Sequence, residues 1–182
     1  MSKRPVVFLD IDDVLCLNTA YTGYDAEAAL RPVGGQPTRR STPPDLWDRL
    51  FALRPRTNLR ALHEEFNPWY VVSSSWRTSF SRGGMETVFR ETGIAFVAEH
   101  LHEIWRTADH KFCFNVAGAR RNEILEWIAR WHDEKSPWIA LDDFESGESL
   151  VGHSNAVLCE PGVGFATDKL EQARDLLRMS GE

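Results

Sequence analysis

Five short apolar runs along the chain have the pattern of strands buried in a parallel sheet. The first spans residues 5–9 and ends in Asp10, and the second spans residues 69–72 and ends in Ser73. Three further runs lie at residues 94–97, 138–141 and 156–158. Uninterrupted apolar runs of about four to eight residues are typical of strands that are covered on both faces. The pattern therefore predicts a strand at each of these five places.

Between the apolar runs, hydrophobic residues recur with helical spacing. The clearest case is Ile124, Trp127, Ile128 and Trp131, which share one face of a helix predicted from about residue 117 to 132. Shorter helical patterns lie at residues 46–53, 59–66, 85–89 and 170–177, and Pro55 is expected to separate the first two. Strands that alternate with helices predict a three-layer α/β fold with a central parallel sheet.

One stretch has no sustained period. Residues 17–44 are rich in Gly and Pro and are predicted to form a small irregular insertion or flap. The stretch is shorter than the usual minimum of about 50 residues for a folded domain. The expectation is therefore one domain over residues 1–182, with no large cap domain and a rather open site.

Acidic and hydroxyl side chains collect where the predicted strands end. In an open parallel sheet, ligands bind outside the carboxyl ends of the strands, so these side chains are expected to meet. Several carboxylates in one place repel each other unless a cation neutralises them, and oxygen ligands favour magnesium. The residues concerned are Asp10, Asp12 and Asp13, then Ser73 and Ser74, and then Asp142 and Asp143.

The spacing of Asp10 and Asp12 indicates two separate roles, one as nucleophile and one in proton transfer. A carboxylate beside a metal ion can attack phosphorus directly. A second carboxylate two residues later can protonate the leaving oxygen and afterwards accept a proton from water. An apolar strand that ends in this pair is a weak signal alone, because strand-end Asp residues often cap turns.

Taken together, these motifs resemble those of the haloacid dehalogenase (HAD) superfamily. Residues 8–15 resemble its first motif, residues 71–73 its second, and residues 141–143 its fourth. The resemblance implies a Rossmann-like fold, a nucleophilic Asp10, an acid/base at Asp12, and Ser73 as a phosphate ligand with Ser74 as a further candidate. It also implies a Mg²⁺ ion among Asp10, Asp12, Asp142 and Asp143, with Asp143 favoured over Asp142 for direct contact.

Other positions leave alternatives open. The third motif of the superfamily is a basic residue, for which Arg120 fits best, with Arg121 and Lys111 behind it. Asp13 stands where the superfamily usually has Gly, and it either caps the turn or adds a carboxylate to the site. Arg77 is either a surface residue beside a helix cap or, like Ser74, a second contact for substrate phosphate.

Composition and charge narrow the choice of function. A 42% hydrophobic and 26% charged chain is ordinary for a globular protein, and nothing in it predicts a membrane span or a secretory signal, so a cytoplasmic location is expected. The net charge of −6 argues against general nucleic-acid coating, but residues 31–60 hold seven Arg against two Asp. That segment, Arg39 and Arg40 included, either draws in polyanions or is simply solvated.

These observations lead to one leading hypothesis and two rivals. The chain is predicted to be a Mg²⁺-dependent phosphatase that works through an aspartyl-phosphate. Its expected partner is a phosphorylated small molecule, a nucleotide or a nucleic-acid end, with Tyr21 and Tyr24 available to stack on a base. The rivals are a catalytically inactive HAD-like phosphate-binding or regulatory domain and a receiver-type signalling module. A receiver would carry its acceptor Asp after a middle strand, where this chain has Ser73.

Overall fold

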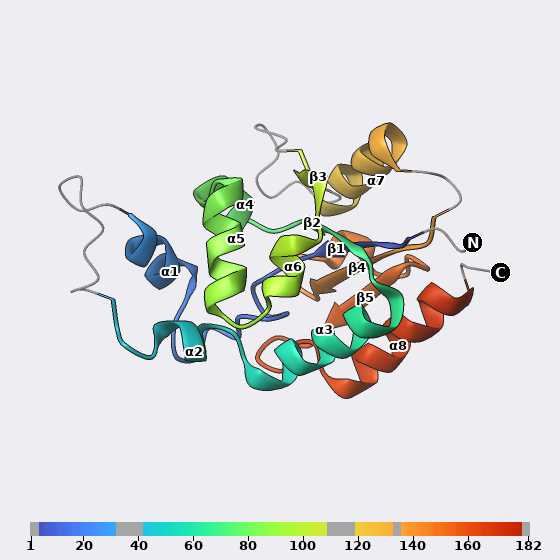
Figure 1. Cartoon of the computed structure of the whole chain (residues 1–182). Helices are drawn as coiled ribbons and strands as arrows, with labels where there is room; N and C mark the ends of the chain where they lie inside the picture. The colour runs from blue at the N-terminus through green and yellow to red at the C-terminus, as the bar shows by residue number, and fades with distance from the viewer. Residues whose placement is uncertain (1–3, 32–41, 109–118, 133–135, 180–182) are drawn as a thin grey trace.

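The protein contains one sheet of five parallel strands in the order β3-β2-β1-β4-β5 (Figure 1). The structure is a computed structural model that describes residues 4–31, 42–108, 119–132 and 136–179. Strand β1 lies at the centre and pairs with β2 on one side and β4 on the other. The strands are β1 Val6–Leu9, β2 Trp69–Val72, β3 Leu101–Arg106, β4 Trp138–Asp143 and β5 Ala156–Cys159.

Helices cover both faces of this sheet. Because side chains alternate along a strand, Val7 and Leu9 of β1 enter one core while Val6 and Phe8 enter the other. Figure 1 shows α3 and α8 on one side and α7 on the other. The helices are α1 Gly23–Leu30, α2 Leu46–Leu50, α3 Leu53–Phe66, α4 Trp76–Ser79, α5 Arg82–Glu91, α6 Ala95–Glu99, α7 Ala119–Trp131 and α8 Thr167–Met179.

This architecture confirms the predicted fold class. The sheet is parallel and flanked by helices, and the runs predicted as the first, second, fourth and fifth strands along the chain are strands. Within the described ranges, the connection from β1 to β2 contains only α1, α2 and α3 and no large cap domain. None of the helices in those ranges combines the length and apolar surface that a membrane span requires.

The third strand was predicted at the wrong place. Residues 95–99 form α6, and β3 follows at Leu101–Arg106. An apolar run of four residues suits a buried helical turn as well as a strand, so periodicity does not distinguish them. Strand β3 lies at the edge of the sheet, and most of its side chains are partly or fully exposed. It therefore lacks the continuous apolar run that marks a central strand.

Two details near the amino-terminal half also differ from expectation. Pro55 lies inside the first turn of α3, and the break between α2 and α3 falls at residues 51–52. Proline is tolerated there because the first N–H groups of a helix have no intrahelical partner. The stretch 17–44 was predicted to be irregular, yet it contains α1, where the Thr22 N–H donates to Asp25 Oδ2 over 2.8 Å. Residues 32–41 lie outside the described part of the chain.

The turn after β1 is held in place by the loop between β5 and α8. The Gly162 N–H donates to Asp13 Oδ1 over 2.7 Å, and the Phe165 N–H donates to the Val14 carbonyl over 3.0 Å. Gly164 has a φ of +74°, and a Cβ there would lie 2.8 Å from both the Val14 carbonyl oxygen and Leu17 Cδ2. A glycine is needed at this contact for both its φ and the close approach.

This contact generates a stability prediction with a matched control. Gly152 has a φ of +78°, but a Cβ there would meet no atom within 4 Å. Gly152→Ala should therefore lower the free energy of unfolding by roughly 1–2 kcal/mol, from the strain of a left-handed alanine alone. Gly164→Ala should lower the free energy of unfolding by about 1–3 kcal/mol more than Gly152→Ala does, because the added methyl group overpacks the turn after β1. Urea denaturation of both variants measures the difference, and equal losses would contradict the proposed contact.

Candidate active site

The site forms at the carboxyl ends of three neighbouring strands, β1, β2 and β4. Leu9 of β1 pairs with Val72 of β2 and with Leu141 of β4. The next residue of each strand is therefore Asp10, Ser73 or Asp142, and all three are buried. The parallel register thus brings together side chains that are far apart in the sequence, as the sequence predicted.

Three of the predicted acids form a cluster that suits a divalent cation. Asp10, Asp142 and Asp143 each offer a carboxylate oxygen, and these oxygens lie within 4.8 Å of one another. Asp10 Oδ2 is buried and has no hydrogen-bond partner among the described residues. An all-carboxylate set with an unsatisfied buried oxygen fits a hard cation such as Mg²⁺.

The carboxylates of this cluster make each other harder to ionise. Burial raises the pKa of Asp10 to about 6, against the opposing effect of the nearby Arg120 guanidinium. Burial also raises the pKa of Asp142, and the neighbouring Asp10 and Asp143 carboxylates raise it further. A bound cation would favour the ionised forms of Asp10 and Asp142.

Asp142 and Asp143 differ in how their oxygens are used. Asp142 Oδ1 accepts from the Asp143 N–H over 3.0 Å, and its Oδ2 lies 3.1 Å from Arg120 Nε. Asp143 Oδ1 accepts from the N–H groups of Glu145 and Ser146 over 2.7 and 2.9 Å. Both side chains are therefore oriented by the structure, and both oxygens of Asp142 are engaged.

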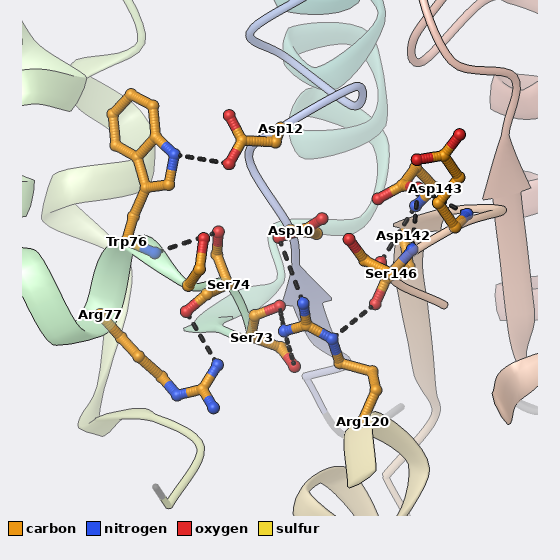
Figure 2. A network of polar contacts seen from close by, with 12 residues as sticks. Asp10, Asp12, Ser73, Ser74, Trp76, Arg77, Arg120, Asp142, Asp143 and Ser146 are labelled. Carbon is orange, nitrogen blue, oxygen red and sulfur yellow. Dashed lines mark hydrogen bonds and ion pairs between the residues drawn. The ribbon is translucent and has the colours of Figure 1, made fainter. Parts of the chain in front are cut away.

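Arg120 is the basic residue that the fold brings to the acids. It lies in the first turn of α7 and donates to the backbone carbonyl and the hydroxyl of Ser73. Its Nη2 lies 3.7 Å from Asp10 Oδ1, so the guanidinium connects the ends of β1, β2 and β4 (Figure 2). Arg121, next to it, is exposed, and Lys111 lies outside the described residues.

The residues that follow Ser73 are more buried than expected. Ser74 is fully buried, and its hydroxyl accepts from the Trp76 backbone N–H over 3.4 Å. Arg77, predicted as either a surface residue or a phosphate ligand, is buried and pairs with Glu123 of α7 over 2.8 Å. It also donates to the Ser74 carbonyl over 2.8 Å. The surface interpretation is wrong because the fold buries Arg77 and brings Glu123 of α7 to it, which the sequence does not reveal.

Asp12 stands apart from the acidic cluster. Its Oδ2 accepts from the indole N–H of Trp76 over 2.9 Å, and its Oδ1 lies 3.4 Å from Asn18 Nδ2 (Figure 2). Its carboxylate lies outside the group formed by Asp10, Asp142 and Asp143, and its role as a metal ligand stays a prediction. Sequence reasoning missed Trp76, whose only signal was its place three residues after Ser73.

Asp13 occupies a left-handed position in the turn after β1. Its φ is +52°, in the left-handed region where glycine is usual and Asp is tolerated. Its side chain accepts the N–H of Gly162. The same residue therefore replaces the usual glycine and ties the first motif to the β5–α8 loop.

Much of the Arg-rich segment serves the fold. Arg49 pairs with Asp45 over 3.1 Å, while Arg56 and Arg60 donate to the carbonyls of Thr92 and Gly93 after α5. Arg39 and Arg40 lie outside the described residues. Of the two tyrosines, Tyr21 donates to Asp45 over 2.6 Å, whereas Tyr24 is 83% exposed.

Comparison with known families gives one match. A family described as the HAD domain in Swiss Army Knife RNA repair proteins matches residues 6–170 of the chain. This range includes all five strands and the site residues Asp10, Ser73, Arg120 and Asp143. No curated protein and no solved structure matched.

The acidic cluster predicts that Mg²⁺ stabilises the fold. At a concentration about 100-fold above the dissociation constant, a ligand that binds only the folded state adds roughly 2.7 kcal/mol. Asp143→Asn should remove most of this increment, because it removes one of the three carboxylates. The matched control is Asp175→Asn, an exposed acid on α8, which should keep it. Melting temperatures in Mg²⁺ and in chelator measure both, and an undiminished increment in Asp143→Asn would exclude the cluster as the metal site.

Proposed function

The chain belongs to the family of HAD domains in Swiss Army Knife RNA repair proteins, and from this we propose that it is a Mg²⁺-dependent phosphatase that removes terminal phosphates from nucleic acid. The observation that carries the proposal is the position of Asp10. Its unpartnered oxygen lies beside two further buried acids, and its other oxygen faces Arg120. Phosphoryl transfer requires a nucleophile with a metal site on one side and a positively charged side chain that can bind phosphate, here Arg120, on the other.

In the first step, we assign the attack on phosphorus to Asp10. A bond forms between a carboxylate oxygen of Asp10 and phosphorus, and the bond from phosphorus to the leaving oxygen breaks. Asp12 gives its proton to that leaving oxygen, so a hydroxyl rather than an alkoxide departs. Arg120 and the hydroxyl of Ser73 offset the negative charge of the transferred group.

In the second step, water replaces the enzyme on phosphorus. Asp12, now ionised, accepts a proton from the attacking water, and the bond from phosphorus to Asp10 breaks. Inorganic phosphate leaves, and both Asp residues return to their starting states. Mg²⁺ held by Asp10, Asp142 and Asp143 would supply charge stabilisation of several kcal/mol on the phosphoryl oxygens.

Three observations support a nucleic-acid end as the substrate. The family is named for RNA repair proteins. The described residues contain no large cap domain that would exclude a polymer. Tyr24 on α1 is exposed, and α1 begins at Gly23, which lies against the indole that contacts Asp12. An exposed aromatic ring on an element next to the site could stack on a terminal base.

The experiment is a turnover assay on RNA oligonucleotides that carry a 5′- or a 3′-phosphate, with an aryl phosphate as a reference. Wild type should release phosphate in Mg²⁺ and stop in excess chelator. Asp10→Asn should lose at least about 10² in rate, because an amide is a poor nucleophile and a poor Mg²⁺ ligand.

The matched control for this assay is Asp175→Asn, which should keep full activity. Wild type that releases no phosphate from any of these substrates would favour the inactive, phosphate-binding alternative. Activity of Asp10→Asn above about a hundredth of wild type would contradict the assignment of the nucleophile.

A further inference from the structure

The indole of Trp76 contacts the proposed acid/base directly. Its Nε1 donates to Asp12 Oδ2 over 2.9 Å, and the side chain of Trp76 is buried. The indole points from α4 toward the turn after β1, where Asp12 lies (Figure 2). This hydrogen bond joins α4, which follows the second motif, to the proton-transfer group of the first motif.

The indole has little freedom to turn away from Asp12. The ring of Phe80 stacks on it with a centroid distance of 5.3 Å, and the ring of Phe51 lies 6.0 Å from it. On a third side, a Cβ at Gly23 would lie 2.8 Å from Trp76 Cε2. The first residue of α1 therefore rests directly on the indole, and a side chain there would push one of them away.

The chemistry of the contact is asymmetric. An indole N–H can donate a hydrogen bond but cannot accept one. In a protonated carboxyl group the carbonyl oxygen is a better acceptor than the hydroxyl oxygen, so the shorter bond from Trp76 favours the proton on Oδ1. The second contact of Asp12, from Asn18 to Oδ1, is longer at 3.4 Å and comes from an exposed side chain.

We propose that Trp76 is a positioning residue that fixes the orientation of the Asp12 carboxyl group and holds its proton on Oδ1, the oxygen that the indole does not contact. The inference rests on the proposed phosphatase function and adds to it a residue outside the four motifs. It also gives α1 a role, since the contact between Gly23 and the indole keeps Trp76 in place.

The dependence of rate on the leaving group tests this role. A nitrophenolate departs without a proton, whereas the hydroxyl oxygen of a sugar needs one. A misplaced Asp12 should therefore slow the release of phosphate from an RNA end much more than from an aryl phosphate. The informative quantity is kcat/KM, because it reports the steps up to departure of the leaving group.

Trp76→Phe keeps an aromatic ring and removes the N–H. We expect kcat/KM for the RNA end to fall at least about tenfold more than kcat/KM for the aryl phosphate, in the same direction as Asp12→Asn. The matched control is Trp138→Phe, at the opposite end of β4. This variant should change kcat/KM for both substrates by the same factor or leave both values unchanged.

A second pair of variants tests the same contact without changing Trp76. Gly23→Ala places a methyl group against the indole and should give the same selective loss, whereas Gly83→Ala meets no atom within 4 Å and should not. The indole N–H resonances provide a readout that does not depend on activity. The signal that disappears in Trp76→Phe should be the one that moves most in Asp12→Asn.

The outcomes separate this inference from the proposed function. If Asp12→Asn shows the selective loss and Trp76→Phe and Gly23→Ala do not, the enzyme assignment stands and the role of Trp76 is overturned. Equal losses on both substrates in Trp76→Phe would reduce it to a packing residue. Wild type without phosphatase activity would overturn the function itself, and the role of Trp76 with it.

Discussion

The repulsion among three buried carboxylates is the constraint on which the rest of the site depends. At about 4 Å, two unit charges repel by roughly 4 kcal/mol at the effective dielectric constant of a protein surface, and by more when buried. Asp10, Asp142 and Asp143 are each at most 3% exposed. Within the described part of the chain, Arg120 offsets this repulsion with one positive charge for three acids, and a divalent cation is the simplest way to balance the remainder.

The surrounding structure holds that one arginine in place. Helix α7 carries Arg120 at its start and Glu123 one turn later, and the buried pair of Glu123 with Arg77 ties α7 to α4. Breaking a buried ion pair from one side leaves an uncompensated charge, so this pair restricts how the two helices can move. One polar network therefore joins the Arg120 guanidinium, the ends of β1 and β2, and the turn that carries Ser74 (Figure 2).

The sequence predicted the parts of this arrangement that depend on local pattern. Apolar runs that end in Asp10, Ser73 and Asp142 located three strands and the acids at their ends, because central strands are continuous in hydrophobicity. Edge strand β3 was missed because its exposed side chains interrupt that signal. The contacts of Trp76 with Asp12 and of Arg77 with Glu123 join residues that are far apart in the sequence, and neither residue type indicates its partner. Spacing alone also does not indicate that the carboxylates of Asp10 and Asp12 point to different partners.

The central claim is that phosphate passes through a covalent bond to Asp10. The most direct measurement is an acid quench, within milliseconds, of wild type mixed with an RNA end labelled in its terminal phosphate, followed by peptide mapping of the protein-bound label. The account predicts an acid-stable, base-labile phosphoryl group on the peptide that contains Asp10. Label on any other residue, or steady turnover with no protein-bound label at any quench time, would contradict it.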